Sequence, residues 1–84
     1  MTVEQLRAAR ALLGWSQAEL AQMAGLSVPT VKRVEAGTGP RVSQEARSKL
    51  QHALEVAGIE FLPGNGKGQG VRFRTPQRTP RGRK

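Results

Sequence analysis

The side chains best suited to chemistry in this chain are cationic, and they are spread unevenly along it. The 84 residues include 14 lysines and arginines, six glutamates and no aspartate. Residues 1–66 carry seven basic and six acidic side chains, a net charge of +1, whereas residues 67–84 carry seven basic side chains and no acidic one, a net charge of +7. Cations gathered in one segment favour a polyanionic partner. Nucleic acid is the first candidate, ahead of an acidic membrane surface and of a tail that only aids solubility.

Catalytic and metal-binding sets are missing from the sequence. It holds one histidine, His52, and no cysteine or aspartate, which excludes a Ser-His-Asp set and leaves no group with zinc-ligand spacing. Glycine at every second position from Gly64 to Gly70 matches neither the dinucleotide fingerprint nor the phosphate loop, since both need a helix directly after the glycines. We therefore expect no catalytic residue, no cofactor-binding residue, no metal ligand and no enzymatic activity.

The compartment follows from the same composition. The absence of cysteine fits a reducing cytosol, and no apolar run is long enough to span a membrane. We expect a cytoplasmic protein without a membrane partner.

Residues 16–35, SQAELAQMAGLSVPTVKRVE, are spaced like two short helices joined by a tight turn. Ser16 is placed to cap the first helix, with Glu19 completing a Ser-x-x-Glu capping box, and Ser27 is placed to cap the second. Gly25 falls where the chain must turn sharply, and glycine adopts a positive φ at little cost. One apolar face on each helix comes from Leu20, Ala21 and Ala24, and from Val31 and Val34. This is the layout of a helix-turn-helix, whose second helix enters the DNA major groove.

Helical periodicity continues on both sides of this motif. A Thr-x-x-Gln box at Thr2 opens a first helix that ends near Gly14, and its helically spaced apolar residues are Val3, Leu6, Ala9, Leu12 and Leu13. Ser43 opens a fourth helix that Gly58 ends, and its apolar stripe consists of Ala46, Leu50, Ala53, Leu54 and Ala57. After Gly58 the apolar period falls to two in residues 59–62 and 71–74, which predicts two short strands around the connection PGNGKGQG.

The periodicity divides the chain into three parts. Residues 1–58 form a helical domain, residues 59–74 a two-strand extension, and residues 75–84 a basic tail without apolar residues, which we expect to be disordered. Two strands this short are marginal alone, so they must lean on the helices or pair with another subunit. The predicted fold class is mostly α, with a short C-terminal β-hairpin and a basic disordered tail.

The stretch from about residue 3 to residue 57 resembles the helix-turn-helix proteins of the Cro and phage-repressor class, also called the xenobiotic-response-element family. Gln17 opens the first helix of the motif, and Glu35 matches a frequent acidic residue near the end of the second. The apolar and turn positions of that class are matched by Leu20, Ala21, Gly25, Leu26, Val31 and Val34. The resemblance implies a four-helix, repressor-like domain. Beyond Gly58 the chain departs from it, because many of those repressors continue with a fifth helix.

The resemblance also implies which residues contact DNA. Gln17 would touch a phosphate while bracing the recognition helix, and Lys32 is placed either to contact phosphate or to remain solvated. Arg33 would suit bidentate recognition of guanine, and Val28 a thymine methyl group. Pro29 occupies a base-reading position without a side-chain donor, although the first turn of a helix tolerates proline. The full expected set is Gln17, Ser27, Val28, Pro29, Thr30, Lys32, Arg33 and Arg41.

An ion pair is implied within the domain. Arg10 interrupts an otherwise apolar helix face, and Arg10 and Glu35 match a paired arginine and glutamate in the phage repressors. We expect them to form a partly buried ion pair that ties the first helix to the end of the recognition helix.

Together these features predict a transcriptional regulator that binds specific sequences of double-stranded DNA. We expect a bacterial or phage repressor that occludes a promoter as a homodimer, with recognition helices about 34 Å apart on an inverted repeat and no cofactor. Dimerisation would depend on the two strands. Two alternatives remain open: an antitoxin-like protein that neutralises a partner toxin and represses its own operon, and an adaptor that binds other proteins.

The tail carries a second set of DNA-binding candidates. Arg78, Arg81, Arg83 and Lys84 are four positive charges without an apolar anchor, suited to phosphate contacts. The ending Pro80-Arg81-Gly82-Arg83-Lys84 is also similar to the core of an AT-hook, in which an Arg-Gly-Arg segment lies in a narrow minor groove. The proline that normally follows is a lysine here.

Deleting residues 75–84 should therefore lower DNA affinity in a salt-dependent and largely sequence-independent manner. If all four tail cations neutralise phosphates, each subunit loses about 3.6 from the slope of log K against log salt, at about 0.9 per phosphate. Titrations across a salt series, on sites with A·T-rich and G·C-rich flanks, measure both effects. Loss of a preference for A·T-rich flanks would indicate minor-groove binding, and an unchanged slope would remove the tail from the binding mechanism.

Overall fold

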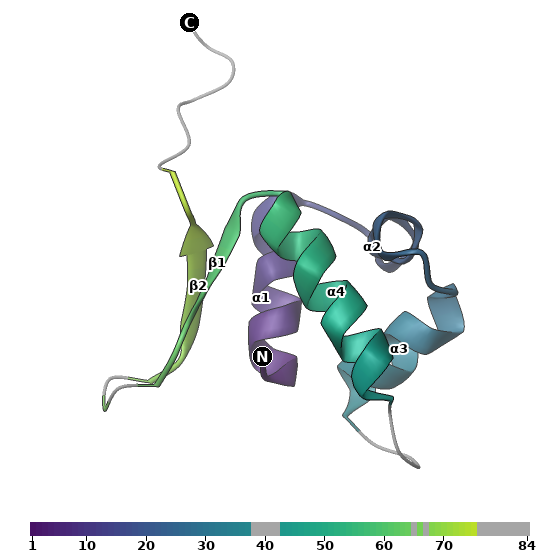
Figure 1. Ribbon diagram of the computed structural model, residues 1–84, viewed down its shortest axis with the longest axis horizontal. Coiled ribbons are helices and arrows are strands. Elements are labelled where there is room, and N and C mark those ends of the chain that lie inside the picture. The colour runs from purple at the N-terminus through teal and green to yellow at the C-terminus, as the bar shows by residue number, and fades with distance from the viewer. Residues whose placement is uncertain (38–42, 65, 67, 76–84) are drawn as a thin grey trace, which may run out of the picture.

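The computed structural model describes residues 1–37, 43–64, 66 and 68–75. These residues form four helices followed by a two-stranded antiparallel sheet: α1 (Val3–Leu13), α2 (Gln17–Ala24), α3 (Val28–Ala36), α4 (Gln44–Val56), β1 (Ile59–Leu62) and β2 (Gly70–Phe73) (Figure 1). The mostly α fold with a C-terminal hairpin is confirmed. Five predicted DNA-binding residues lie outside the described residues: Arg41, Arg78, Arg81, Arg83 and Lys84.

Each helix begins at the cap that the sequence predicts. The Thr2 hydroxyl accepts a hydrogen bond from the Gln5 amide, and the Ser16 hydroxyl accepts one from the Glu19 amide, both at 3.0 Å. Ser27 and Ser43 accept equivalent bonds at α3 and α4. The turn between α2 and α3 is fixed by Gly25, at φ 72°, and by the next amide, Leu26 N–H, which donates to the Ala21 carbonyl at 2.9 Å. These local bonds set the angle at which α3 leaves α2.

The core is formed by all four helices and the first strand. Its largest fully buried side chains are Leu6, Leu20, Val31, Val34, Leu50, Leu54 and Ile59. Ala21 is buried where α2 and α3 pack together, and a residue this small lets the two helices approach closely.

Two details of the helices differ from what the sequence pattern indicates. Leu12 is 44% exposed, because the inward face of α1 is already taken by Leu6, Ala9 and Leu13. Helix α4 ends at Val56 with Ala57 as its cap, before the predicted Gly58. Gly58 instead turns the chain into β1 with φ 106°, a conformation that favours glycine.

The hairpin packs against the helices along one face. Its register pairs Ile59 with Phe73 and Phe61 with Val71, so these four apolar side chains share one face, while Glu60 and Arg72 form an ion pair on the other. Ile59 is completely buried in the helical core, and the other three apolar residues pack against it. Strand β1 lies beside α4 and strand β2 beside α1. The second strand begins at Gly70, one residue before the predicted start.

The side chain of Gln5 joins the hairpin to α1. It is buried, and its Oε1 accepts a hydrogen bond from the Thr2 amide at 2.9 Å. Its Nε2 donates to the carbonyls of Leu62 at 2.9 Å and Gly70 at 3.0 Å, one on each strand. Both amide protons and the amide oxygen are therefore satisfied, as a buried polar group requires. The sequence identified Gln5 only as part of a capping box.

A polar cluster around the buried Glu35 carboxylate connects α1, α2 and α3. The Glu35 carboxylate accepts bonds from Arg10 Nε at 2.8 Å, Arg10 Nη2 at 3.2 Å and Gln17 Nε2 at 2.9 Å. Arg10 Nη1 also donates to the Trp15 carbonyl at 2.9 Å. Arg7 donates to the main-chain carbonyl of Glu35 at 2.5 Å. The cluster fixes α3 against the first two helices.

Replacing Gln5 with leucine should lower the free energy of unfolding by about 1–3 kcal/mol, because the Thr2 amide loses its acceptor and two strand carbonyls lose a donor. The control is Gln22→Leu, since Gln22 is exposed on α2. Urea unfolding of both variants measures the difference. Equal stabilities would show that the Gln5 amide does not hold the hairpin in place.

Breaking the Arg10–Glu35 pair should destabilise the domain more strongly. Arg10→Met leaves the buried Glu35 carboxylate without its cation, which costs on the order of 3 kcal/mol. Glu35→Leu leaves Arg10 unpaired and also removes the partner of Gln17. The double variant should lose less stability than the two single variants added together, because the two side chains interact directly.

The exposed pair Arg72–Glu60 provides the matched control. Arg72→Met should change stability by at most about 1 kcal/mol, because a solvated ion pair contributes little. Thermal or urea melts of all four variants make the comparison. Neutral melts for both Arg10→Met and Glu35→Leu would rule out a structural role for the buried pair.

Candidate nucleic-acid interface

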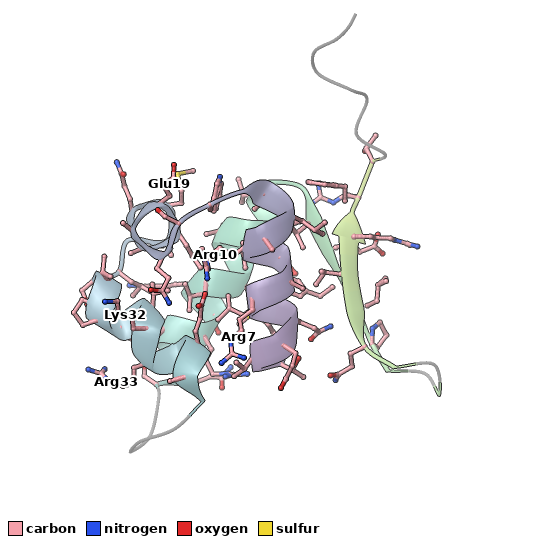
Figure 2. All side chains as sticks on the ribbon, turned by 180° about the vertical axis from the view of Figure 1, so that it is seen from behind. Arg7, Arg10, Glu19, Lys32 and Arg33 are labelled. Atoms are coloured by element: carbon pink, nitrogen blue, oxygen red, sulfur yellow. The ribbon has the colours of Figure 1, made fainter. Side chains whose placement is uncertain are left out.

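Helix α3 separates an inward face from an outward face. Val31, Val34 and Glu35 are buried, while Lys32 and Arg33 are exposed. Figure 2 shows the Arg33 side chain extending from the outer edge of α3, with Lys32 on the same helix. No carboxylate among the described residues forms an ion pair with either of them. Their cationic groups are therefore available to an anionic partner.

The N-terminal turn of α3 carries the remaining predicted residues of this helix. Pro29 is exposed in the first turn, where its ring fits. The Ser27 and Thr30 hydroxyls lie 2.8 Å apart and bond each other, so the cap also orients Thr30. Val28 is only half exposed, because part of its side chain packs against the core. The exposed part of the Val28 side chain is a small apolar surface.

A polar groove lies between α3 and the N-terminal half of α4. It is lined by Leu26, Thr30, Arg33, Ser43, Glu45, Ala46 and Lys49. Lys49 Nζ lies 3.4 Å from Glu45 Oε2, so the acidic residue of the groove already has a cation beside it. Sequence reasoning missed Glu45 and Lys49. Their i,i+4 spacing on α4 was the available signal, although such pairs are common on solvated faces.

Gln17 sits at the first position of α2 with its side-chain amide bonded to Glu35. The main-chain N–H groups of Gln17 and Ala18 bond no acceptor among the described residues, since the Ser16 hydroxyl serves Glu19 and the next bond runs from Leu20 to Ser16. Unpaired N–H groups at a helix start attract anions. The structure thus links an anion-attracting helix start to α3 through one buried carboxylate.

Arg7 also helps to hold α3 in place, a role that the sequence analysis did not assign to it. It lies between α1 and α3 in Figure 2, and its guanidinium donates to the carbonyl of Glu35 near the C-terminus of α3. A cation at that end of a helix is favourable, because the carbonyl groups there carry partial negative charge. Its spacing of three residues from Arg10 placed both arginines on the same side of α1.

Residues 1–37, 43–64, 66 and 68–75 contain no group of three or more His, Asp or Glu side chains arranged to hold a metal ion. No helix within these residues has the length and apolarity needed to cross a membrane.

Comparison with known proteins agrees with this geometry. A family model described as helix-turn-helix matches residues 6–61, two thirds of the chain, from the core of α1 into β1. A search of curated proteins returned no match. The match includes the capped α2–turn–α3 unit, the buried Glu35 and the outward face of α3. The chain therefore belongs to the helix-turn-helix family of the Cro and phage-repressor class, a family of DNA-binding transcription regulators.

Proposed function

We propose that the protein is a homodimeric transcriptional repressor that binds a specific inverted-repeat operator, occludes a promoter and requires no cofactor. The observation that carries this proposal is the outward face of α3, which the bonds to the buried Glu35 hold on the domain. Its Lys32 and Arg33 form no ion pair with any carboxylate that the structure describes. In this proposal the protein is encoded by a bacterium or a phage and acts on DNA in the bacterial cytoplasm.

In this proposal α3 lies in the major groove with its N-terminal turn toward the bases. Arg33 reads guanine through two parallel hydrogen bonds, and the free part of Val28 contacts a thymine methyl group. Ser27 and Thr30 offer hydroxyls to bases or phosphates, while Pro29 supplies shape only. Lys32 neutralises a phosphate at the edge of the groove.

The start of α2 binds a phosphate and thereby sets the register of α3. The unpaired N–H groups of Gln17 and Ala18 supply the donors, together with the second amide proton of Gln17. Because the same Gln17 amide bonds Glu35, movement of the phosphate contact is transmitted to the end of α3. Arg41 and the tail cations add further phosphate contacts in this proposal.

The three-part division remains part of the proposal. Residues 1–58 supply DNA binding, residues 59–74 supply dimerisation, and residues 75–84 supply salt-dependent affinity. The buried position of Ile59 means that the second part shares its core with the first.

One observation favours the antitoxin-like alternative. Met23 is 58% exposed and flanks a groove between α2 and α4 whose apolar residues include Ala24 and Ala53. Exposed methionine suits adaptable protein contacts. If a partner protein copurifies in fixed ratio, Met23→Glu should release it and leave DNA affinity unchanged. Recovery of the protein without such a partner favours the repressor.

Arg33 and Gln17 should affect DNA binding in different ways. Arg33→Ala should cost roughly 1–3 kcal/mol on the best site and relax the preference at one base pair, as expected for a bidentate base contact. Gln17→Ala should weaken binding to all sequences alike, because phosphates carry no sequence information. Selection of bound fragments from a random DNA pool, followed by titration of ranked sites, measures both.

The control is Arg47→Ala, which removes an arginine from α4, outside both α3 and the hairpin, and should leave the ranking of sites unchanged. If Arg33→Ala also leaves the ranking unchanged, Arg33 contacts phosphate and base reading lies elsewhere on α3. If no ranked site emerges from the pool for the unmodified protein, the proposal of sequence-specific repression fails.

A further inference from the structure

The outer edge of β2 carries unpaired main-chain groups. The Arg74 amide donates to the Gly58 carbonyl at 2.7 Å, which makes these two residues a hydrogen-bonded pair of the antiparallel ladder. Pairing alternates along such a ladder, so Glu60–Arg72 and Leu62–Gly70 also exchange bonds across it. The N–H and C=O groups of Val71 and Phe73 consequently point away from β1. They bond no other residue in the described part of the chain.

The outer edge of β1 is closed by comparison. Its outward residues are Ile59 and Phe61, and Ile59 is 0% exposed beside α4, so its main chain is out of reach of another strand. The next outward position is Pro63, which has no N–H to donate. On β2 the outward series runs through Gln69, Val71, Phe73 and Thr75 without a proline, and none of these residues is fully buried.

Helix α1 places an unpartnered apolar surface beside this open edge. Ala8 and Leu12 are four residues apart on one side of α1, and both are exposed. Ala8 also lines the groove that α1 forms with the start of β2, together with Gln69 and Gly70. An added strand would therefore meet free main-chain groups and a small aliphatic surface at the same place.

We propose that this surface is the dimer interface, occupied by β2 of a second copy in antiparallel register. Val71 pairs with Phe73 of the partner subunit, and Phe73 pairs with Val71 of the partner subunit. The result is a continuous four-stranded sheet with the two β1 strands outermost. The partner's copy of α1 then lies on the same side of the sheet, and Leu12 becomes covered. This interface rests on the homodimer of the proposed function, and it assigns the residues that form it.

The geometry favours a second copy over an unrelated strand. The two-fold axis passes between Arg72 and Arg72 of the partner subunit, and the same surface is complementary to itself, as a closed dimer requires. Each Arg72 remains paired with the Glu60 of its own chain, at 3.1 Å, which offsets the repulsion between the two arginines. Four strands also remove the weakness of an isolated two-stranded sheet.

A single cysteine tests the register directly, because the natural chain has none. In this interface the two copies of residue 72 form a non-hydrogen-bonded pair with Cα atoms about 4.5 Å apart, within the range that a disulfide spans. Full-length Arg72→Cys incubated with oxidised glutathione should form a disulfide-linked dimer, the glutathione being reduced as the two thiols are oxidised. The matched control is Glu60→Cys, which breaks the same exposed ion pair on the other strand.

Non-reducing electrophoresis should show at least about tenfold more linked dimer for Arg72→Cys than for Glu60→Cys. A second pair of variants measures the apolar part of the interface. Leu12→Glu should weaken dimerisation by about tenfold or more in light scattering across a concentration series, whereas Val56→Glu, at a residue 70% exposed on α4, should not.

The outcomes separate this interface from the proposed function. Linking of Glu60→Cys in preference to Arg72→Cys would show that β1 forms the interface, and linking of neither in a protein that still scatters as a dimer would place the interface elsewhere. Both results overturn the β2 interface and leave the homodimer intact. A monomer at high concentration and on DNA would overturn the homodimer as well, without affecting base reading by α3.

Discussion

The arrangement of this domain depends on one buried carboxylate. Glu35 is 4% exposed, and its two oxygens are bonded by Arg10 and Gln17, from α1 and α2, while its main-chain carbonyl is bonded by Arg7. A carboxylate so deeply buried is tolerable only with its charge balanced and its oxygens satisfied. The apolar core, whose largest buried side chains are leucine, isoleucine and valine, holds the helices together. The directional hydrogen bonds to Glu35 fix the rotation of α3 about its own axis, and this rotation sets the direction in which Lys32 and Arg33 point.

A similar division of labour occurs at the other end of the molecule, where the hairpin lies across α1 and α4 from the recognition helix (Figure 1). Apolar burial of Ile59 holds the hairpin to the helices, and the Gln5 amide, bonded to both strands, fixes its position. In both places a buried polar side chain with its hydrogen bonds satisfied adds directional contacts to the apolar packing. The orientation of α3 and the position of the hairpin are therefore each set by one interior polar group.

The two surfaces also differ in what they can recognise. The outward face of α3 is cationic and carries groups that can distinguish base edges, whereas the open edge of β2 offers only repeating main-chain groups with a small aliphatic border. Within the hairpin Arg72 pairs with Glu60, and Arg74 at its end donates to the main-chain carbonyl of Glu55 on α4. Such an edge suits another extended strand, whereas Lys32 and Arg33 on α3 have no carboxylate partner among the described residues.

The sequence by itself determined the helices, their caps and the tight turn, because these depend on neighbours within four residues: a serine or threonine before each helix and Gly25 between α2 and α3. The apolar periods located most of the core and both strands. The tertiary structure alone decided the exposure of Leu12, since α1 already filled its inward face with three other side chains. It also decided the bonds from Gln5 to Leu62 and Gly70, which lie 57 and 65 positions further along the chain. The placement of Glu45 and Lys49 along the groove beside Arg33 was likewise decided by the tertiary structure. For Gln5, Glu45 and Lys49 the physical reason is that these contacts join residues distant in sequence, and no local propensity or period specifies which distant partner a side chain will meet.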